Sequence, residues 1–92
     1  MYTVVTTNRY RSSLKRVSRQ KNFNSKNLAK VIEALARGEK LASRYHDHQL
    51  SGTLKKLREC HVQNDLLLVY QKKDDVLVLS LIELGTHASL FG

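Results

Sequence analysis

The sequence predicts an α+β fold, in which two N-terminal helices cover one face of a small, mostly antiparallel sheet. Apolar residues recur at helical spacing in the first half of the 92-residue chain and form short strand-like runs in the second half. Short polar turns separate the runs of the second half, and such turns join neighbouring antiparallel strands. The predicted element order is therefore β-α-α-β-β-β, in a single domain over residues 1–92.

The first half begins with the β-branched segment YTVVTT at residues 2–7, which predicts a short strand. Either Thr7 or Asn8 then caps a helix, because both side chains can accept a hydrogen bond from the first helical turn. The apolar stripe of this helix consists of Tyr10, Leu14 and Val17.

The polar segment RQKNFNS at residues 19–25 ends this helix, and either Asn24 or Ser25 caps a second one. Gly38 closes the second helix, as a glycine just beyond a helix commonly does. The stripe of the second helix consists of Leu28, Val31, Ile32 and Leu35.

The second half changes from helical to strand spacing. The segment YHDHQLSG at residues 45–52 is predicted to be a loop, and strands follow over residues 54–62, 65–71 and 76–84. The tight connections QND and KKDD make neighbouring strands antiparallel. The last two strands are apolar at successive positions, which is typical of central strands covered on both faces.

The charge of the chain is concentrated at one end. The net charge is +8, and residues 1–44 contain eleven basic and two acidic residues, whereas residues 45–92 contain five and six. So lopsided a field attracts polyanions, so we expect nucleic acid or an acidic protein as the partner. The basic residues of the first helix that we expect to bind RNA are Arg11, Lys15 and Arg19.

The composition also limits the setting of the protein. The N-terminal segment lacks the basic and apolar regions of a signal peptide, and no apolar run is long enough to span a bilayer. The single cysteine, Cys60, cannot form an internal disulfide, which fits a reducing compartment. We therefore expect a soluble, cytoplasmic protein that does not contact a membrane.

The side chains capable of catalysis lie outside the basic helices. His46, Asp47 and His48 share the predicted loop, and strand alternation places Glu59 and His61 on one face, about 6.5 Å apart. A carboxylate beside an imidazole favours and orients its protonated form. Two further candidates are Asp65, in a turn, and His87, near the C-terminus.

Each candidate also has a structural interpretation. His46 and His48, taken singly, suit a solvated loop, and Asp47 and Asp65 suit a loop and a turn. Cys60 alternates to the face opposite His61, so it suits the core, and Phe91 can fill an apolar gap. The spacing of His46, His48, Cys60 and His87 matches no common zinc pattern, so we expect no metal and no other cofactor.

Taken together, histidines and carboxylates beside a basic surface favour metal-free cleavage of RNA. RNA supplies its own nucleophile, the 2′-OH, so the protein must move two protons and stabilise a more negatively charged phosphate. Imidazoles titrate near neutral pH and suit the proton transfers. We therefore expect His87 to transfer a proton and Phe91 to stack on a nucleotide base.

Three linked motifs, DHQLSG, RECHVQNDLLLVY and GTHASLFG, resemble the YafQ branch of the RelE superfamily of bacterial toxins, closely over residues 40–92 and in layout before them. The resemblance implies a RelE-like microbial RNase fold and a ribosome-dependent endoribonuclease that cuts mRNA in the A site. It also implies a cognate acidic antitoxin and a toxin–antitoxin complex that binds operator DNA. The implied functional residues are His48, His61, Asp65, His87 and Phe91, with Glu59 where the family has Asp or Glu.

The chain departs from the family pattern at two positions. Leu66 stands where the family can have a stacking Trp, and Glu83 stands where an Arg often contacts phosphate. Lys55 has the same strand parity as Glu59 in the predicted strand, so it is a candidate to replace that Arg. The alternative hypothesis is a weakened or inactive toxin-like module that acts by binding nucleic acid or an antitoxin.

Overall fold

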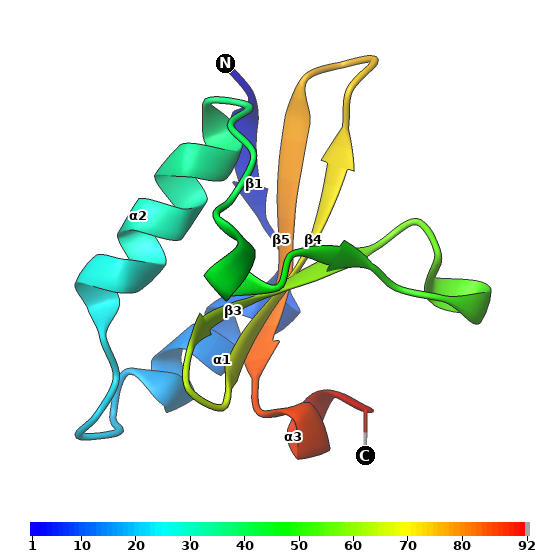
Figure 1. The fold of residues 1–92 in the computed structure, drawn as a ribbon. Coiled ribbons are helices and arrows are strands. Elements are labelled where there is room, and N and C mark those ends of the chain that lie inside the picture. The colour runs from blue at the N-terminus through cyan, green and yellow to red at the C-terminus, as the bar shows by residue number, and fades with distance from the viewer. Residues whose placement is uncertain (92) are drawn as a thin grey trace.

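The computed structural model describes residues 1–91 and confirms the α+β fold (Figure 1). The five strands form one sheet in the order β1-β5-β4-β3-β2, in which β1 and β5 are parallel and all other pairs are antiparallel. The strands are β1 (Thr3–Thr6), β2 (His48–Gln49), β3 (Arg58–Gln63), β4 (Leu66–Lys73) and β5 (Val78–Gly85). The helices are α1 (Asn8–Val17), α2 (Ser25–Ala36) and α3 (His87–Phe91), and the 3₁₀ turns are η1 (Ser43–Tyr45) and η2 (Gly52–Leu54).

Helix α1 begins at the predicted cap and seals an edge of the sheet. The Thr7 hydroxyl accepts a hydrogen bond from the Tyr10 amide at 3.0 Å, which satisfies one of the free amides of the first turn. Beyond the end of β1, the buried Ser13 hydroxyl accepts a hydrogen bond from the Leu84 amide of β5 at 3.0 Å. Helix α1 therefore satisfies a backbone group of β5 that β1 is too short to reach.

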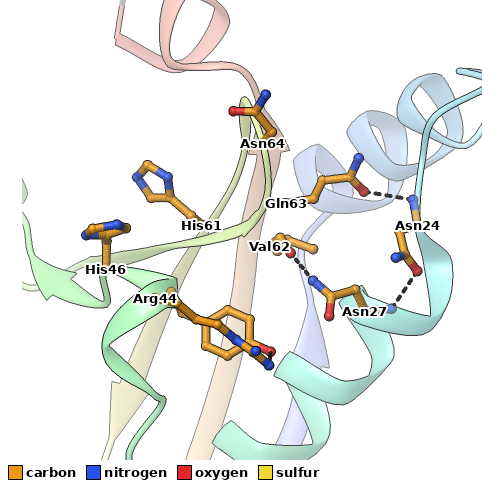
Figure 2. A pocket seen from close by; sticks show the side chains of 9 residues that line it. Asn24, Asn27, Arg44, His46, His61, Val62, Gln63 and Asn64 are labelled. Atoms are coloured by element: carbon orange, nitrogen blue, oxygen red, sulfur yellow. Dashed lines mark hydrogen bonds between the residues drawn. The ribbon is translucent and has the colours of Figure 1, made fainter.

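Helix α2 also begins at a predicted cap. The Asn24 side chain accepts from the Asn27 amide at 3.0 Å, and the Asn27 carboxamide donates to the Val62 carbonyl of β3 (Figure 2). Gly38 follows the helix with a φ of +79°, a conformation that glycine adopts without strain. The start of α2 is thereby fixed to β3.

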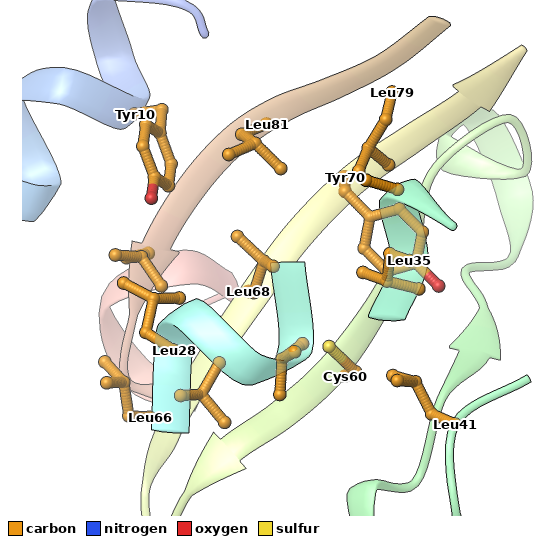
Figure 3. Close-up of a cluster of buried hydrophobic side chains, with 14 of the residues drawn as sticks. Tyr10, Leu28, Leu35, Leu41, Cys60, Leu66, Leu68, Tyr70, Leu79 and Leu81 are labelled. Atoms are coloured by element: carbon orange, nitrogen blue, oxygen red, sulfur yellow. The ribbon is translucent and has the colours of Figure 1, made fainter. Parts of the chain in front are cut away.

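The main core lies between the helices and one face of the sheet (Figure 3). Leu28 and Leu35 of α2 pack against Leu68 and Tyr70 of β4 in this cluster, and Cys60 of β3 is fully buried there, as the alternation predicted. Burial raises the pKa of the Cys60 thiol to about 12, so the thiol is neutral and unreactive at physiological pH.

The prediction that β3 starts at residue 54 was wrong. Leu54 ends η2, and residues 55–57 form a turn outside the sheet, where the Leu50 amide donates to the Leu57 carbonyl at 2.9 Å and closes a surface loop. Leu54 remains 42% exposed, so little apolar burial favours an extended path there. Lys55 lies in this loop, and the strand-parity argument for it therefore does not hold.

A β-bulge in β5 changes which side chains face the core. Val69 of β4 pairs with Glu83, but the next residue, Tyr70, pairs with Leu81, so Ile82 is the extra residue. The insertion reverses the alternation and places Leu84, not Glu83, on the helix side with Leu81. Strict alternation along residues 76–84 would place Glu83 on the face of Leu79 and Leu81, and the bulge turns it to the opposite face.

No helix within residues 1–91 combines the length and the apolar character that crossing a membrane requires.

Candidate active site

The face of the sheet away from the two long helices carries the predicted catalytic side chains. Directly opposite residues of antiparallel strands point to the same side, and the register runs from His48 through Glu59 and Val69 to Glu83 across four strands. The next row runs from His61 through Leu67 to Gly85. We call this surface the second face.

His48 is held between two acceptors. Its Nε2 lies 3.0 Å from Glu59 Oε1, and its Nδ1 lies 2.7 Å from the His46 carbonyl oxygen. A neutral imidazole has one N–H, whereas the imidazolium donates from both nitrogens. The arrangement therefore suits a positively charged His48 ring, which is half exposed and available to a phosphate.

Glu59 is an unusual residue for a sheet interior. The residue is 5% exposed, and its Oε2 has no hydrogen-bond partner among residues 1–91. A buried carboxylate oxygen without a partner is costly, and such groups concentrate at functional sites. Glu59 therefore both orients His48 and keeps one oxygen unused by the fold.

His46, a candidate that the sequence also suited to a solvated loop, joins the cluster. Its ring centroid lies 5.1 Å from that of His61, and its backbone adopts a left-handed conformation with a φ of +49°. This conformation is uncommon for a residue with a side chain. His46 thus contacts both other histidines of the cluster, His48 through its carbonyl and His61 through its ring.

Asp47 fixes the loop that carries these histidines. Its carboxylate accepts a hydrogen bond from the Tyr70 hydroxyl and pairs with Arg58 at 3.3 Å, on the helix side of the sheet. Burial, and then the bond to Asp47, raise the pKa of the Tyr70 hydroxyl, so it stays protonated as a donor. Because Asp47 points to this side, its neighbours His46 and His48 reach the second face.

His87 and Phe91 lie together on α3. Their ring centroids are 5.3 Å apart, and both side chains are exposed. Helix α3 folds against the end of β5 because Gly85 has no side chain, since a Cβ there would collide with Ser89. Gly85 is two strands from His61, about 10 Å across the sheet, so His87 starts on the far side of the same surface.

Asp65 and Leu66 lie at the hairpin between β3 and β4. Asp65 is exposed in the turn with a φ of +56°, a conformation that Asp tolerates better than most residues. Leu66 is buried in the main core, so it offers no surface on which a base can stack. The stacking surface that a Trp side chain would offer is therefore absent at residue 66.

Glu83 has an ion-pair partner. Its carboxylate lies 3.8 Å from the guanidinium of Arg9, at the start of α1, and its side chain is 23% exposed. Glu83 shares a row of the second face with Glu59, so both carboxylates border the same surface.

The other predicted binding residues lie apart from this cluster. The Arg11 guanidinium donates to Thr6 and Asn8, so it also braces the start of α1, while Lys15 and Arg19 are exposed on and just beyond α1. Lys55 lines a cavity of about 440 Å³ beside Arg58 and Tyr70, on the helix side. The fold therefore does not bring Lys55 into the row with Glu59.

Residues 1–91 contain no group of three or more His, Cys, Asp or Glu side chains arranged to hold a metal ion.

The fold is shared with solved bacterial toxins. A metal-bound toxin from Helicobacter pylori has a TM-score of 0.90 and 44% sequence identity, covering 99% of this chain and 100% of that one. A copper-bound mutant toxin from the same organism has a TM-score of 0.91 at 33% identity, with the same coverage. The Escherichia coli DinJ-YafQ complex has a TM-score of 0.89 and 26% identity over the whole of both chains.

Residues 2–92 match the family described as the bacterial toxin of type II toxin-antitoxin systems, YafQ, and the chain belongs to this family. The mRNA interferase toxin YafQ of Escherichia coli K12 is 44% identical over 48 residues, which are 52% of this chain and 50% of that protein. The putative toxin YafQ of Haemophilus influenzae is 44% identical over 41 residues, 45% of this chain and 40% of that protein. The matches thus span about half the length of these curated relatives or less.

Proposed function

We propose that this toxin is an mRNA interferase, an endoribonuclease that cleaves mRNA on the ribosome and is neutralised by a cognate antitoxin. The observation that carries the proposal is the cluster on the second face, in which Glu59 and the His46 carbonyl hold His48 and the ring of His61 lies beside them. Relatives that are 42–44% identical over about half of this chain are named mRNA interferase toxins, which agrees with this chemistry.

The reaction follows from the roles that these groups can take. His61 removes the proton of the 2′-OH, whose oxygen then attacks the neighbouring phosphorus. The charged His48 ring stabilises the additional negative charge of the pentacoordinate phosphate. His87 donates a proton to the departing 5′-oxygen, and the products are a 2′,3′-cyclic phosphate and a 5′-hydroxyl end. Phe91 stacks on a base, and Asp65 borders the site at the hairpin turn.

The partners follow from the charge distribution. Ribosomal RNA is a dense polyanion, and the basic N-terminal half is the surface that we expect to contact it. The same surface suits an acidic antitoxin segment that folds over it and blocks it, and the DinJ-YafQ complex shows such a toxin with its partner. Operator DNA would be bound through the toxin–antitoxin complex. A ribosomal target places the protein in the cytoplasm.

The test is to induce the protein without an antitoxin and to map the 5′ ends of cleaved mRNA. We expect His87→Gln to lower cleavage by about 10²-fold or more while the melting temperature stays unchanged, because the proton donor is lost from an exposed position. Lys73→Gln, at the opposite end of the sheet, is the matched control and should cleave as the wild type does. Wild-type cleavage by His87→Gln would remove His87 from the mechanism.

The second candidate function is a weakened toxin that acts by binding. Two observations favour it. Leu66 is buried in the core and cannot stack on a base, and residue 83 is a carboxylate paired with Arg9, so it provides no cation for a phosphate. A protein that slows growth and binds ribosomes without producing new mRNA ends would support this candidate against the nuclease.

A further inference from the structure

A second feature borders the catalytic cluster. Where β2 stops pairing with β3, a cavity of about 500 Å³ opens between the β3–β4 hairpin, η1 and the first turn of α2 (Figure 2). Its volume falls within the range of about 300–1,000 Å³ that is usual for ligand pockets. The side chains that line it belong to Asn24, Asn27, Arg44, Tyr45, His46, His61, Val62, Gln63 and Asn64.

The lining combines flat rings with carboxamides. His46 and His61 form one wall, and the Arg44 guanidinium lies 4.9 Å from the centre of the Tyr45 ring on another. Four of the nine lining residues carry a carboxamide, and none of the nine is acidic. Single-stranded RNA is recognised by this combination, in which bases stack on aromatic or guanidinium planes and hydrogen-bond through their edges.

The internal hydrogen bonds of the lining divide it into a fixed part and an available part. Gln63 accepts from the Asn24 amide at 2.7 Å and donates to the Asn22 carbonyl at 2.8 Å, so both ends of its carboxamide are occupied. Asn27 donates to Val62, which leaves its carbonyl oxygen as an acceptor. Asn64 and Arg44 are exposed at the rim. Arg44 Nη2 donates to the Tyr45 hydroxyl at 2.9 Å, and the other guanidinium donors, like the Asn64 carboxamide, can reach a ligand without loss of a core contact.

We propose that this cavity is the subsite for a nucleotide of the mRNA next to the scissile phosphate, and that Asn64 and Arg44 set the base preference there. The proposal rests on the proposed nuclease function, because His61 belongs both to the cavity wall and to the catalytic cluster. A base in the cavity stacks beside the His46 and His61 rings, and its edge meets the carboxamides. Its phosphate then lies toward the second face, where the cleavage takes place.

The first test measures base preference and total cleavage separately. Cut sites are sequenced for the wild type, for Asn64→Ser, for Arg44→Gln and for Lys56→Gln, a control in the loop beside the other cavity. We expect Asn64→Ser and Arg44→Gln to flatten the preference at one position beside the cut by about three- to tenfold, the factor that one hydrogen bond provides. Lys56→Gln should keep the wild-type preference. Cleavage with an unchanged preference in both rim variants would overturn the proposal.

The second test does not depend on cleavage. A short single-stranded RNA with 2′-O-methyl groups, which block the nucleophile, is titrated into the wild type, and the side-chain amide signals of Asn24, Asn27 and Asn64 are followed by NMR. We expect these signals to shift on binding, and we expect the shifts of the Asn24 and Asn27 amides, which remain in the variant, to be lost in Arg44→Gln/Asn64→Ser. Shifts elsewhere with these signals unmoved would overturn the subsite even if the protein is a nuclease. If the wild type cuts no mRNA but these signals shift with the RNA, the nuclease function fails and the RNA-binding site stands. If an antitoxin peptide shifts these signals and the RNA does not, the cavity binds the antitoxin and the proposed subsite is wrong.

Discussion

Glu59→Gln tests the centre of the proposed site with a change of charge and almost none of shape. Glu59 Oε1 lies 3.0 Å from His48 Nε2, and hydrogen bonds to charged groups contribute about 1.5–3 kcal/mol. Such a loss corresponds to a factor of roughly 10–150 in rate. The His48 side chain is 51% exposed, so water screens the pair, and we expect the lower part of that range, about 10- to 50-fold.

The same substitution should not destabilise the fold. Glu59 Oε2 is buried without a partner among residues 1–91, and a neutral amide is less costly to bury than a carboxylate. We therefore expect the melting temperature of Glu59→Gln to equal or exceed that of the wild type. Glu59→Asp keeps the charge and is the matched control, which should retain more cleavage than Glu59→Gln.

The assay combines mapped mRNA cleavage with NMR of the imidazole nitrogens. The nitrogen shifts of His48 should differ between the wild type, in which Glu59 Oε1 lies 3.0 Å from Nε2, and Glu59→Gln, in which the amide can donate to Nε2 and leave Nδ1 as the protonated nitrogen. Cleavage at the wild-type rate despite this change at His48 would refute the role of the Glu59–His48 pair. Equal losses in Glu59→Gln and Glu59→Asp would show that geometry, and not charge, is the sensitive quantity.

The remaining predictions concern the second face, the basic half and the core. Glu83→Gln should raise cleavage by up to about fivefold, because it removes one screened repulsion of roughly 0–1 kcal/mol. Glu83→Arg should raise cleavage further, up to about tenfold, because it also adds a cation for the phosphate. Loss of cleavage in folded Glu83→Gln would instead make Glu83 a base. Lys15→Glu/Arg19→Glu should weaken ribosome binding in sedimentation assays and reduce the salt dependence of that binding. The control Lys40→Glu/Lys73→Glu carries the same change of charge elsewhere and should have a smaller effect. Equal effects of the two variants would mean that α1 does not contact the ribosome. Cys60 should resist alkylation at pH 8 in the folded protein, because burial raises its pKa to about 12, and rapid labelling would contradict its place in the core. Because the folded-state pKa values of Cys60 and Tyr70 are raised, the unfolded chain loses these protons at lower pH than the folded protein does. The free energy of unfolding should therefore fall as the pH rises above about 9. An unfolding free energy that is constant from pH 8 to pH 11 would contradict this.

Much of the fold could be predicted because it depends on local chemistry. Thr7 and Asn24, each one of two predicted candidates, cap their helices, since a short polar side chain before an apolar stripe satisfies free amides nearby in the chain. Cys60 reaches the core because neighbouring strand residues alternate between faces. The pairing of His48 with Glu59 could not be predicted in this way, because it depends on which strand lies beside which.

The start of β3 and the place of Lys55 were predicted wrongly for a related reason. The segment 54–62 has a continuous strand-like pattern, but a strand persists only where a neighbour pairs with it, and β2 pairs with β3 only at residues 58–59. The pattern itself contains no information about the length of that neighbour. The two-residue edge strand β2 was absent from the prediction for the same reason, and α3, which packs against the end of β5, was also not predicted.

By itself, the sequence determined the α+β class, the two capped helices, the basic N-terminal half and the set of side chains able to move protons. These properties depend on residue type and on spacing within one element, which are written in the chain. The tertiary structure decided which of those side chains meet. The bulge at Ile82 moves Glu83 from the core side to the second face, and the contacts of Asp47 direct His46 and His48 to that face. Both depend on register between strands that are distant in sequence, and a shift of one residue reverses the face of every side chain that follows it.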